Sequence, residues 1–224
     1  MAIEVATNDC TALTDTDIEE MADLSVSGDS GVDVGLLSKS KEAWVLVTQA
    51  RENGKLLGYS FCTLERIGGT PCVLWGMAAI KRNPKREQVL KAITSDQYRR
   101  ALLAFPDEDV LVGTRVVSPS GFMGLAGLTD IVPRPNYKAS GEERAWARRL
   151  AKRFGVDGKV DDKSFVVTGD GEAVGIFDHV ALKPEKLDPA AEEFFADVDA
   201  KRRDQVIAFG WAMAEDLSKK FGPA

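Results

Sequence analysis

Two glycine-containing turns separate three strand-like runs near the middle of the chain, and this pattern constrains the fold more than any other feature. The runs extend from Ala43 to Ala50, from Leu56 to Leu64 and from Cys72 to Ile80. Asn53-Gly54 and Gly68-Gly69 lie between them, and such residues readily adopt the positive φ angles of a tight hairpin turn. The sequence therefore predicts an antiparallel meander of three strands.

A basic helix, a fourth strand and a short helix are predicted after the meander. Asn83-Pro84 is typical of a helix start, because asparagine caps free N–H groups and proline at the first helical position loses no hydrogen bond. Apolar residues at helical spacing continue this helix to about Ala104. Asp109 to Val117 predicts the fourth strand, and Ser118-Pro119 begins a short helix that reaches Leu125. These elements indicate an α/β protein of the α+β kind, with a mixed, mostly antiparallel sheet flanked by helices.

The N-terminal segment contains a helix signal and a loop signal. Thr16 and Glu19 have the spacing of a capping box, which predicts a helix ending near Ser25. The segment from Ser27 to Gly35 is rich in glycine, serine and aspartate and is predicted to be a loop that could be mobile.

The C-terminal part is predicted to be mainly helical. Its expected elements are a brief strand from Ile131 to Pro133, a helix from a capping box at Ser140 and Glu143 to Phe154, a hairpin formed by Ser164 to Thr168 and Ala173 to Phe177, a helix starting at Asp188-Pro189, and a last helix from about Asp199 to Phe221. We expect residues 138–224 to form an extension, with a helix, a hairpin and two helices, that packs on a core formed by residues 1–137.

Composition indicates a cytoplasmic protein without a membrane segment. The longest apolar stretch, from Val73 to Ile80, is much shorter than the roughly 20 residues of a spanning helix. Met1 to Asp9 has neither a basic start nor a long apolar run, so we expect no secretory signal. Cys10, Cys62 and Cys72 cannot all pair within one chain. We expect them to be buried thiols, and we expect no metal site.

Positive charge is concentrated in one segment of an acidic chain. Seven basic and two acidic residues lie between Lys81 and Arg100, a local charge of +5 in a protein whose formal net charge is −6. A small phosphorylated ligand fits this distribution better than a polyanion does. We therefore expect no nucleic acid partner, because the remainder is acidic and contains no identifiable nucleic-acid-reading module.

The order of elements from Thr16 to Pro133 resembles the GCN5-related N-acetyltransferase family. In that family the helix after the third meander strand binds the pyrophosphate of coenzyme A, and exposed backbone groups of that strand hold the pantetheine arm. The resemblance implies acetyl-CoA or another acyl-CoA as cosubstrate and an amine, on a small molecule or a protein, as acceptor. The coenzyme-binding positions that it implies are Met77, Ala78, Ala79, Lys81, Arg82, Lys85 and Arg86.

The resemblance also implies two catalytic candidates. The family usually has an asparagine after the fourth strand and a catalytic tyrosine about seven residues later, where this chain has Ser118 and Leu125. A carboxylate on the meander commonly accepts the proton of the amine, and Glu65 is the only carboxylate in the two longer strands. We take Glu65 and Ser118 as candidates. As alternatives, Glu65 is a hairpin-end charge paired with lysine or arginine, and Ser118 is a helix cap.

Two hypotheses for function remain at this stage. One is an acyl-CoA-dependent N-acyltransferase with an unidentified amine substrate. The other is a binding or assembly module that has lost catalysis and engages a partner, or a second copy in a homodimer, through its C-terminal helices. No glycine occurs between Gly76 and Gly113, so the family's phosphate-binding glycine pattern is missing. Small residues at Gly76, Ala78 and Ala79 either make room for the pantetheine arm or allow close packing of a neighbouring helix.

Overall fold

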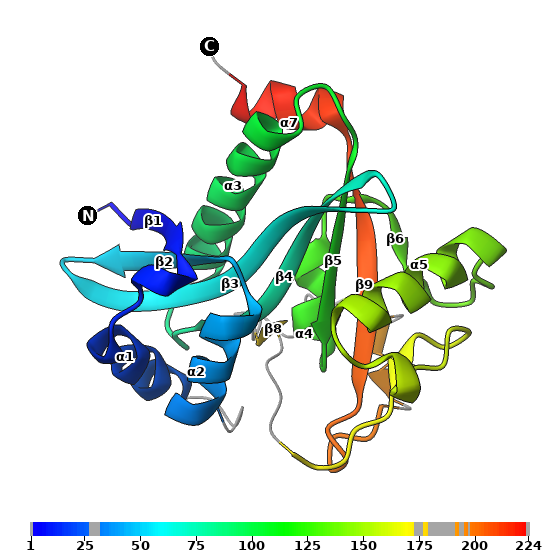
Figure 1. The fold of residues 1–224 in the computed structure, drawn as a ribbon, viewed down its shortest axis with the longest axis horizontal. Coiled ribbons are helices and arrows are strands. Elements are labelled where there is room, and N and C mark those ends of the chain that lie inside the picture. The colour runs from blue at the N-terminus through cyan, green and yellow to red at the C-terminus, as the bar shows by residue number, and fades with distance from the viewer. Residues whose placement is uncertain are drawn as a thin grey trace.

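The computed structural model describes residues 2–26, 32–172, 177–178, 191–192, 195–196 and 198–222. Within them, one sheet has the strand order β1-β2-β3-β4-β5-β9-β6, and β7 pairs with β9 while β8 pairs with β4 (Figure 1). The strands are β1 (Glu4–Asp9), β2 (Leu46–Glu52), β3 (Lys55–Ile67), β4 (Thr70–Ile80), β5 (Val110–Val116), β6 (Thr129–Val132), β7 (Val166–Val167), β8 (Phe177–Asp178) and β9 (Gln205–Ala212).

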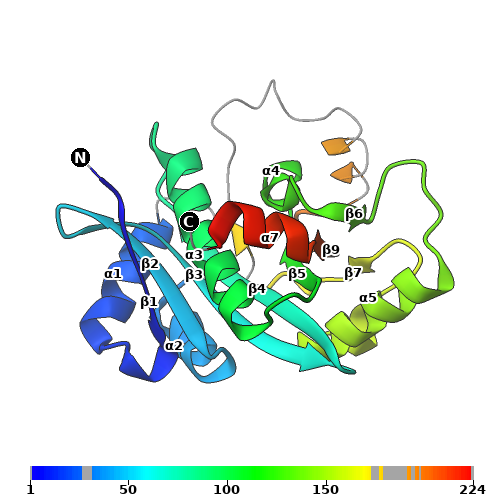
Figure 2. The ribbon, with the colours of Figure 1, turned by 90° about the horizontal axis from the view of Figure 1, so that it is seen from above.

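Helices cover both faces of this sheet. They are α1 (Asp15–Val26), α2 (Val34–Ala43), α3 (Arg86–Ala104), α4 (Pro119–Phe122), α5 (Gly141–Arg153) and α7 (Ala214–Phe221), with single 3-10 turns η1 (Cys10–Ala12), η2 (Met123–Leu125) and η3 (Asp157–Lys159). Figure 1 shows α3 on one side of β2 and β3, and α1 and α2 on the other side; Figure 2 shows the same arrangement from above, with α3 in front of the strands. None of the described helices is both long and apolar enough to cross a lipid bilayer.

The predicted meander is confirmed. β2, β3 and β4 pair in antiparallel order. Asn53 and Gly54 have φ angles of 51° and 76°, and Gly68 and Gly69 have φ angles of 60° and 89°. The left-handed conformations that the two turns require are therefore present at the predicted residues.

The mixed character of the sheet is also confirmed. After the meander, α3 crosses over and returns the chain to β5, which pairs with β4 in parallel. The short helix after β5 is present as α4 and η2. A capping box at Ser140 and Glu143 begins α5. The caps that predicted α4 and α5, at Ser118 and Ser140, are the residues at which the two helices begin.

The core lies on both faces of the meander. Met21 and Leu37, from α1 and α2, pack with Tyr59 and other residues of the sheet. Val89 and Ile93 of α3 pack on the opposite face. The meander strands are therefore covered on both sides, and their main chain is accessible only at strand edges and ends.

The N-terminal predictions need correction. The α1 helix begins at Asp15, and its cap is formed by Thr14 and Asp17: Thr14 Oγ1 accepts from the N–H of Asp17, at 3.2 Å, and Asp17 Oδ2 accepts from the N–H of Thr14, at 3.0 Å. Thr16 lies inside the helix, so Thr16 and Glu19 do not form the capping box. The segment predicted as a loop enters α2 at Val34, and residues 27–31 lie outside the described residues. Strand β1 and helix α2 were not predicted.

The predicted helix from Asp199 to Phe221 is wrong over most of its length. Residues Gln205–Ala212 form strand β9, and only Ala214–Phe221 is helical. β9 lies between β5 and β6 and is buried along nearly all of its length. A strand covered on both faces has apolar residues at most positions, so several of them also match helical spacing. The segment from Asp199 to Phe221 thus contains a strand and a short helix rather than one long helix.

Strand β9 also crosses the predicted division of the chain. It comes from the predicted extension, yet it separates β5 from β6 in the sheet of the predicted core. The division after residue 137 as a domain boundary stays a prediction. The hairpin expected from Ser164 to Phe177 is not formed by the described strands, because β7 pairs with β9 and β8 pairs with β4. Residues 173–176, and most of the helix predicted from Asp188, lie outside the described residues.

Candidate functional site

Strands β4 and β5 pair only over part of their length and then diverge. Their parallel register runs from Cys72 opposite Leu111 to Leu74 opposite Gly113. Just beyond this register, Thr114 Oγ1 donates a hydrogen bond to the carbonyl oxygen of Trp75, at 3.0 Å. Strand β4 continues to Ile80. We call residues 77–80, on the side that has left β5, the β4 edge.

The β4 edge is paired with β8. Ala78 lies opposite Phe177, and Ala79 lies opposite Asp178, in parallel register. The main chain of this edge therefore accepts an extended segment from a distant part of the sequence. Sequence reasoning missed this contact, because the run ending at Phe177 was interpreted as half of a local hairpin and contains no signal for a partner on β4.

Side chains of the β4 edge point into the protein. Met77, Ala78 and Ala79 are 1%, 1% and 4% exposed, respectively. A Cβ atom added to Gly76 would lie 2.3 to 2.7 Å from three atoms of the Trp44 indole ring. The small residue at position 76 is therefore explained by packing of Trp44, which follows α2. At Ala78 and Ala79, only the main chain is available to a partner.

Two exposed cations follow the β4 edge directly. Lys81 donates its N–H to the carbonyl oxygen of Leu57, at 2.8 Å, which fixes the turn that leaves the strand. The side chains of Lys81 and Arg82 are exposed. Within the described part of the chain, neither side chain takes part in an ion pair or a side-chain hydrogen bond. They therefore give this end of the sheet positive charge that no described carboxylate neutralises.

The other two predicted basic residues are engaged within the protein. Lys85 Nζ lies 2.6 Å from each carboxylate oxygen of Glu52, and this hydrogen bonding lowers the pKa of Glu52. Arg86 is partly buried and has a further partner. The four basic residues thus lie near one end of β4, and of these four only Lys81 and Arg82 have side chains without a partner among the described residues.

The start of α3 differs from the prediction by two residues. Its N-cap is Lys85, which forms no side-chain cap. Asn83 Oδ1 instead accepts from the N–H of Lys85, at 2.9 Å, and closes a turn before the helix. Asn83-Pro84 is therefore the approach to the helix and not its first turn.

Glu65 lies far from the basic turn. Its Oε1 atom is 2.6 Å from Nε of Arg153, and the two form an ion pair. In the β3 and β4 pairing, Glu65 is opposite Cys72, whereas Ser60 is opposite Ala78. Five residues of extended strand separate Glu65 from Ser60, a distance of about 17 Å. The structure does not bring Glu65 to the β4 edge, and its catalytic role stays a prediction.

Ser118 caps a helix. Its Oγ atom accepts from the N–H of Gly121, at 3.2 Å, at the N-terminus of α4. Leu125, where the resemblance implies the general acid, is fully buried in the core. A catalytic role for Ser118 stays a prediction, but its hydroxyl already has a structural partner.

A partly buried arginine next to the point of divergence was not predicted. Arg115 follows Thr114 on β5, and its guanidinium carbon lies 5.3 Å from the centre of the Phe154 ring. Burial lowers the pKa of Arg115 to about 10, so it still carries a positive charge at neutral pH. No sequence motif surrounds this residue. It adds a cation on β5, next to the place where β4 and β5 separate.

A cavity of about 560 Å³ lies between α3, α7 and the segment before β6. Tyr98, from α3, stacks on Phe221 with ring centres 5.9 Å apart, and it contacts Trp75 at the same distance. Burial raises the pKa of Tyr98, so its phenol stays protonated. Lys91 and Lys220 also line this cavity. None of the residues that line it belongs to the β4 edge.

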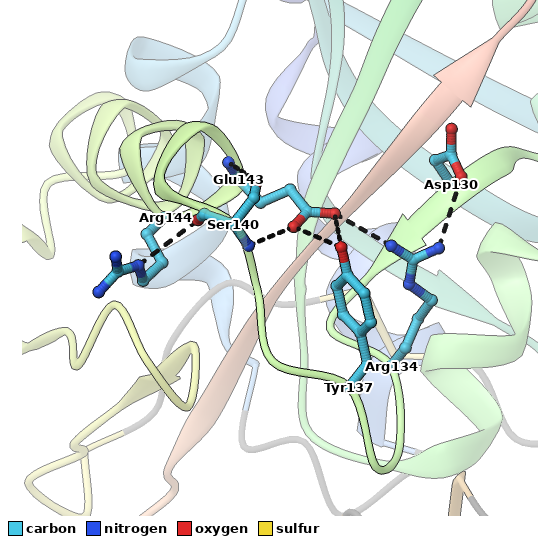
Figure 3. A network of polar contacts seen from close by, with 6 residues as sticks. All are labelled: Asp130, Arg134, Tyr137, Ser140, Glu143 and Arg144. Atoms are coloured by element: carbon cyan, nitrogen blue, oxygen red, sulfur yellow. Dashed lines mark hydrogen bonds and ion pairs between the residues drawn. The ribbon is translucent and has the colours of Figure 1, made fainter.

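A polar network surrounds the start of α5 (Figure 3). Glu143 accepts from the N–H of Ser140, at 2.6 Å, from the Tyr137 hydroxyl, at 3.0 and 3.2 Å, and from Arg134, at 3.1 Å. Arg134 also bonds Asp130. Hydrogen bonds from Ser140 lower the pKa of Glu143 against the opposing effect of burial. The network holds the helix start, and both oxygens of its carboxylate accept hydrogen bonds from within the protein.

Comparison with known proteins gives a structural likeness and no sequence match. No family model matches the chain, and no curated protein matches it. Among solved structures, ribosomal-protein-alanine N-acetyltransferase from Brucella melitensis biovar Abortus 2308 has a TM-score of 0.39 and 17% identity over 50% of this chain and 79% of its own.

Two other solved structures show the same level of likeness. Aminoglycoside 6'-N-acetyltransferase from Enterococcus faecium has a TM-score of 0.39 and 9% identity over 50% of this chain and 62% of its own. A GNAT family acetyltransferase from Brucella melitensis, solved with acetyl-CoA, has a TM-score of 0.35 and 13% identity over 49% of this chain and 75% of its own. The chain is thus similar in structure to GCN5-related N-acetyltransferases at low sequence identity. This likeness covers about half of the chain.

Within the described ranges, no group of three or more histidine, cysteine, aspartate or glutamate side chains is arranged to hold a metal ion. The three cysteines are buried, as predicted. Burial raises the pKa of Cys62 to about 12 and that of Cys72 to about 11, so neither thiol is ready to act as a nucleophile.

Proposed function

We propose that the chain is an acyl-CoA-dependent N-acyltransferase whose acceptor is an amine on a small molecule or a protein. The observation that carries this proposal is the divergence of β4 from β5 after Trp75. It leaves the main chain of the β4 edge unpaired with β5. Pantetheine contains two amides in an extended chain, and an extended amide chain binds a strand edge in the way that an added strand does.

The charge at the end of β4 supports an anionic coenzyme. Lys81 and Arg82 are exposed and follow the β4 edge without a break in the chain. Helix α3 begins a few residues later, and the N-terminus of a helix favours negative charge. We propose that Lys81 and Arg82 contact the phosphates of the coenzyme. Lys85 and Arg86 contribute less, because each already has a partner.

Acyl transfer to an amine requires that the amine nitrogen attack the thioester carbonyl carbon and lose a proton, while the thiolate leaves and gains one. The β4 edge would position the donor for this attack. Glu65 and Ser118 remain candidates for proton transfer from the sequence resemblance alone, since one is ion-paired about 17 Å along the strand and the other caps α4. The chemistry thus depends on positioning more than on an identified acid or base.

Loss of catalysis is the second candidate function, and two observations favour it. The position that the resemblance assigns to the general acid is Leu125, which lies fully in the core. The β4 edge is also occupied by β8. A binding or assembly module would keep the fold and bind coenzyme A without transferring an acyl group, or would bind no coenzyme.

Isothermal titration with coenzyme A and acetyl-CoA tests the proposal. Wild type is compared with Lys81→Ala/Arg82→Ala and with Lys39→Ala/Lys219→Ala, a control that removes two other exposed charges. Charge-assisted hydrogen bonds contribute about 1.5–3 kcal/mol each, so we expect the first pair to weaken binding by roughly a hundredfold. The control should bind like wild type.

Absence of binding by wild type at millimolar coenzyme would contradict the proposal. Equal weakening by the two double variants would show that only net charge matters, and the proposed contacts would be wrong. Binding without acyl transfer to any of a panel of small amines and amine-bearing peptides would favour the binding module over the enzyme.

A further inference from the structure

We propose that β8 and the donor's pantetheine arm compete for the same main-chain groups of the β4 edge, so that the chain inhibits its own binding of the coenzyme. This inference rests on the proposed function. It concerns a contact within the chain, between Phe177-Asp178 and Ala78-Ala79, and it predicts that coenzyme binding requires β8 to leave.

Pantetheine and β8 cannot bind the β4 edge together, because both edges of β4 are already paired at Ala78 and Ala79. A residue in a strand has one N–H and one carbonyl, and a strand has two edges. One edge of β4 is paired with β3, where Ser60 lies opposite Ala78 and Tyr59 lies opposite Ala79. The other edge has left β5 and is paired with β8. Every main-chain direction at Ala78 and Ala79 is therefore taken, and a third extended group cannot bind there while β8 stays.

The contact is short enough to be displaced. Two residue pairs join β8 to β4, whereas seven join β5 to β9. On the β4 side, the methyl groups of Ala78 and Ala79 provide little side-chain contact for the added strand. The net contribution of a few main-chain hydrogen bonds is small, so a ligand with its own amides and phosphates can replace them.

The contact is also tethered, which makes the competition effective. β7 is held on β9 through Val166 and Val167, and the chain reaches β8 soon afterwards. A tethered competitor acts at a high effective concentration without any need for strong contacts. Weak pairing and a short tether together describe an inhibitory segment that lowers the apparent affinity for coenzyme without abolishing it.

The test uses proline to remove the N–H groups of β8. In Phe177→Pro/Asp178→Pro the strand loses both donors. The matched control, Phe177→Leu/Asp178→Asn, changes both side chains but keeps both N–H groups. Coenzyme A is titrated calorimetrically into each full-length protein, and hydrogen exchange is followed in a peptide that covers residues 74–80. Asp178→Pro alone serves as a second variant if the double variant does not fold.

We expect the proline variant to bind coenzyme A on the order of tenfold more tightly than wild type, since one or two hydrogen bonds no longer oppose binding. Hydrogen exchange at residues 74–80 should be faster in the proline variant and unchanged in the control. Equal affinity of all three proteins, with faster exchange in the proline variant, would overturn the inference and leave the proposed function standing. If none of the three proteins binds coenzyme A, although faster exchange shows that the β4 edge is uncovered in the proline variant, both the inference and the proposed function would be overturned.

Discussion

Gly76→Ala tests how closely α2 and the meander pack. The added Cβ atom would lie 2.3 Å from Cε2 and 2.5 Å from Cζ2 of Trp44, while ordinary carbon contacts are about 3.5–4.0 Å. Gly76 is not among the glycines with positive φ, so alanine adds no backbone strain. The clash with the indole ring is therefore the whole of the unfavourable effect.

The magnitude follows from displacement of a large aromatic ring by about 1 Å. Overpacking of this kind costs about 1–3 kcal/mol, and we expect Gly76→Ala to lower the free energy of unfolding by about 2 kcal/mol. Trp44→Ala removes the half-buried ring and should cost about 3 kcal/mol. In that background Gly76→Ala should be nearly neutral, because the atoms with which it clashes are gone. The double variant should therefore be about 2 kcal/mol more stable than the sum of the two single effects would give.

Urea denaturation of the four proteins of this cycle provides the measurement, with the slope of unfolding checked for constancy. Gly141→Ala serves as a control, because a Cβ atom at Gly141 meets nothing within 4 Å; it should leave stability equal to wild type or slightly higher. A wild-type stability for Gly76→Ala would refute the packing explanation. So would an equal cost of Gly76→Ala in the presence and in the absence of the ring.

Three further predictions concern single side chains. Glu65→Gln should lower the free energy of unfolding by less than about 1 kcal/mol, because the pair with Arg153 is partly exposed. It should leave the Kd for coenzyme A unchanged in titration, and a large change in that Kd would contradict the placement of Glu65 away from the β4 edge. Asp204→Ala should lower the free energy of unfolding, measured in urea, by about 3 kcal/mol, since the carboxylate is 1% exposed and accepts from the N–H of Gly169 at 2.8 Å. A decrease of less than about 1 kcal/mol would contradict this role of the carboxylate. Burial raises the pKa of Cys62 from its ordinary 9.0 to about 12, so the stability that the buried thiol contributes is complete below pH 9 and is lost as pH rises toward 12. Between pH 8 and pH 11, the free energy of unfolding should therefore fall less in Cys62→Ala than in wild type, and an equal fall in both proteins would contradict this effect of Cys62.

Elements with local signals could be predicted from the sequence. The turns at Asn53-Gly54 and Gly68-Gly69 and the cap at Ser140 act within a few residues, so composition and spacing are sufficient to locate them. Strand β9 could not be located in this way, because its partners lie far away in the sequence and its burial on both faces removes the alternation that marks a half-buried strand. The contact of β8 with β4 depends entirely on a distant partner.

Only part of the candidate site could be predicted for the same reason. The basic cluster at Lys81 and Arg82 is contiguous in sequence, and it is exposed at the end of β4. Glu65 was chosen as a carboxylate on the meander, but its position along β3 and its pairing with Arg153 depend on tertiary structure. Arg115 carries no motif, and its position beside Phe154 could be recognised only after folding placed the end of α5 next to β5.

The most direct test of the central claim is to follow the backbone amide signals of the β4 edge by NMR while coenzyme A is added. If the edge holds the pantetheine arm, the amides of Ala78, Ala79 and Lys81 should shift and saturate together, and those of Phe177 and Asp178 should change as β8 leaves. Signals that remain constant at Ala78 and Ala79 while others move, for example at Tyr98 beside the separate cavity, would contradict the claim and place the coenzyme elsewhere.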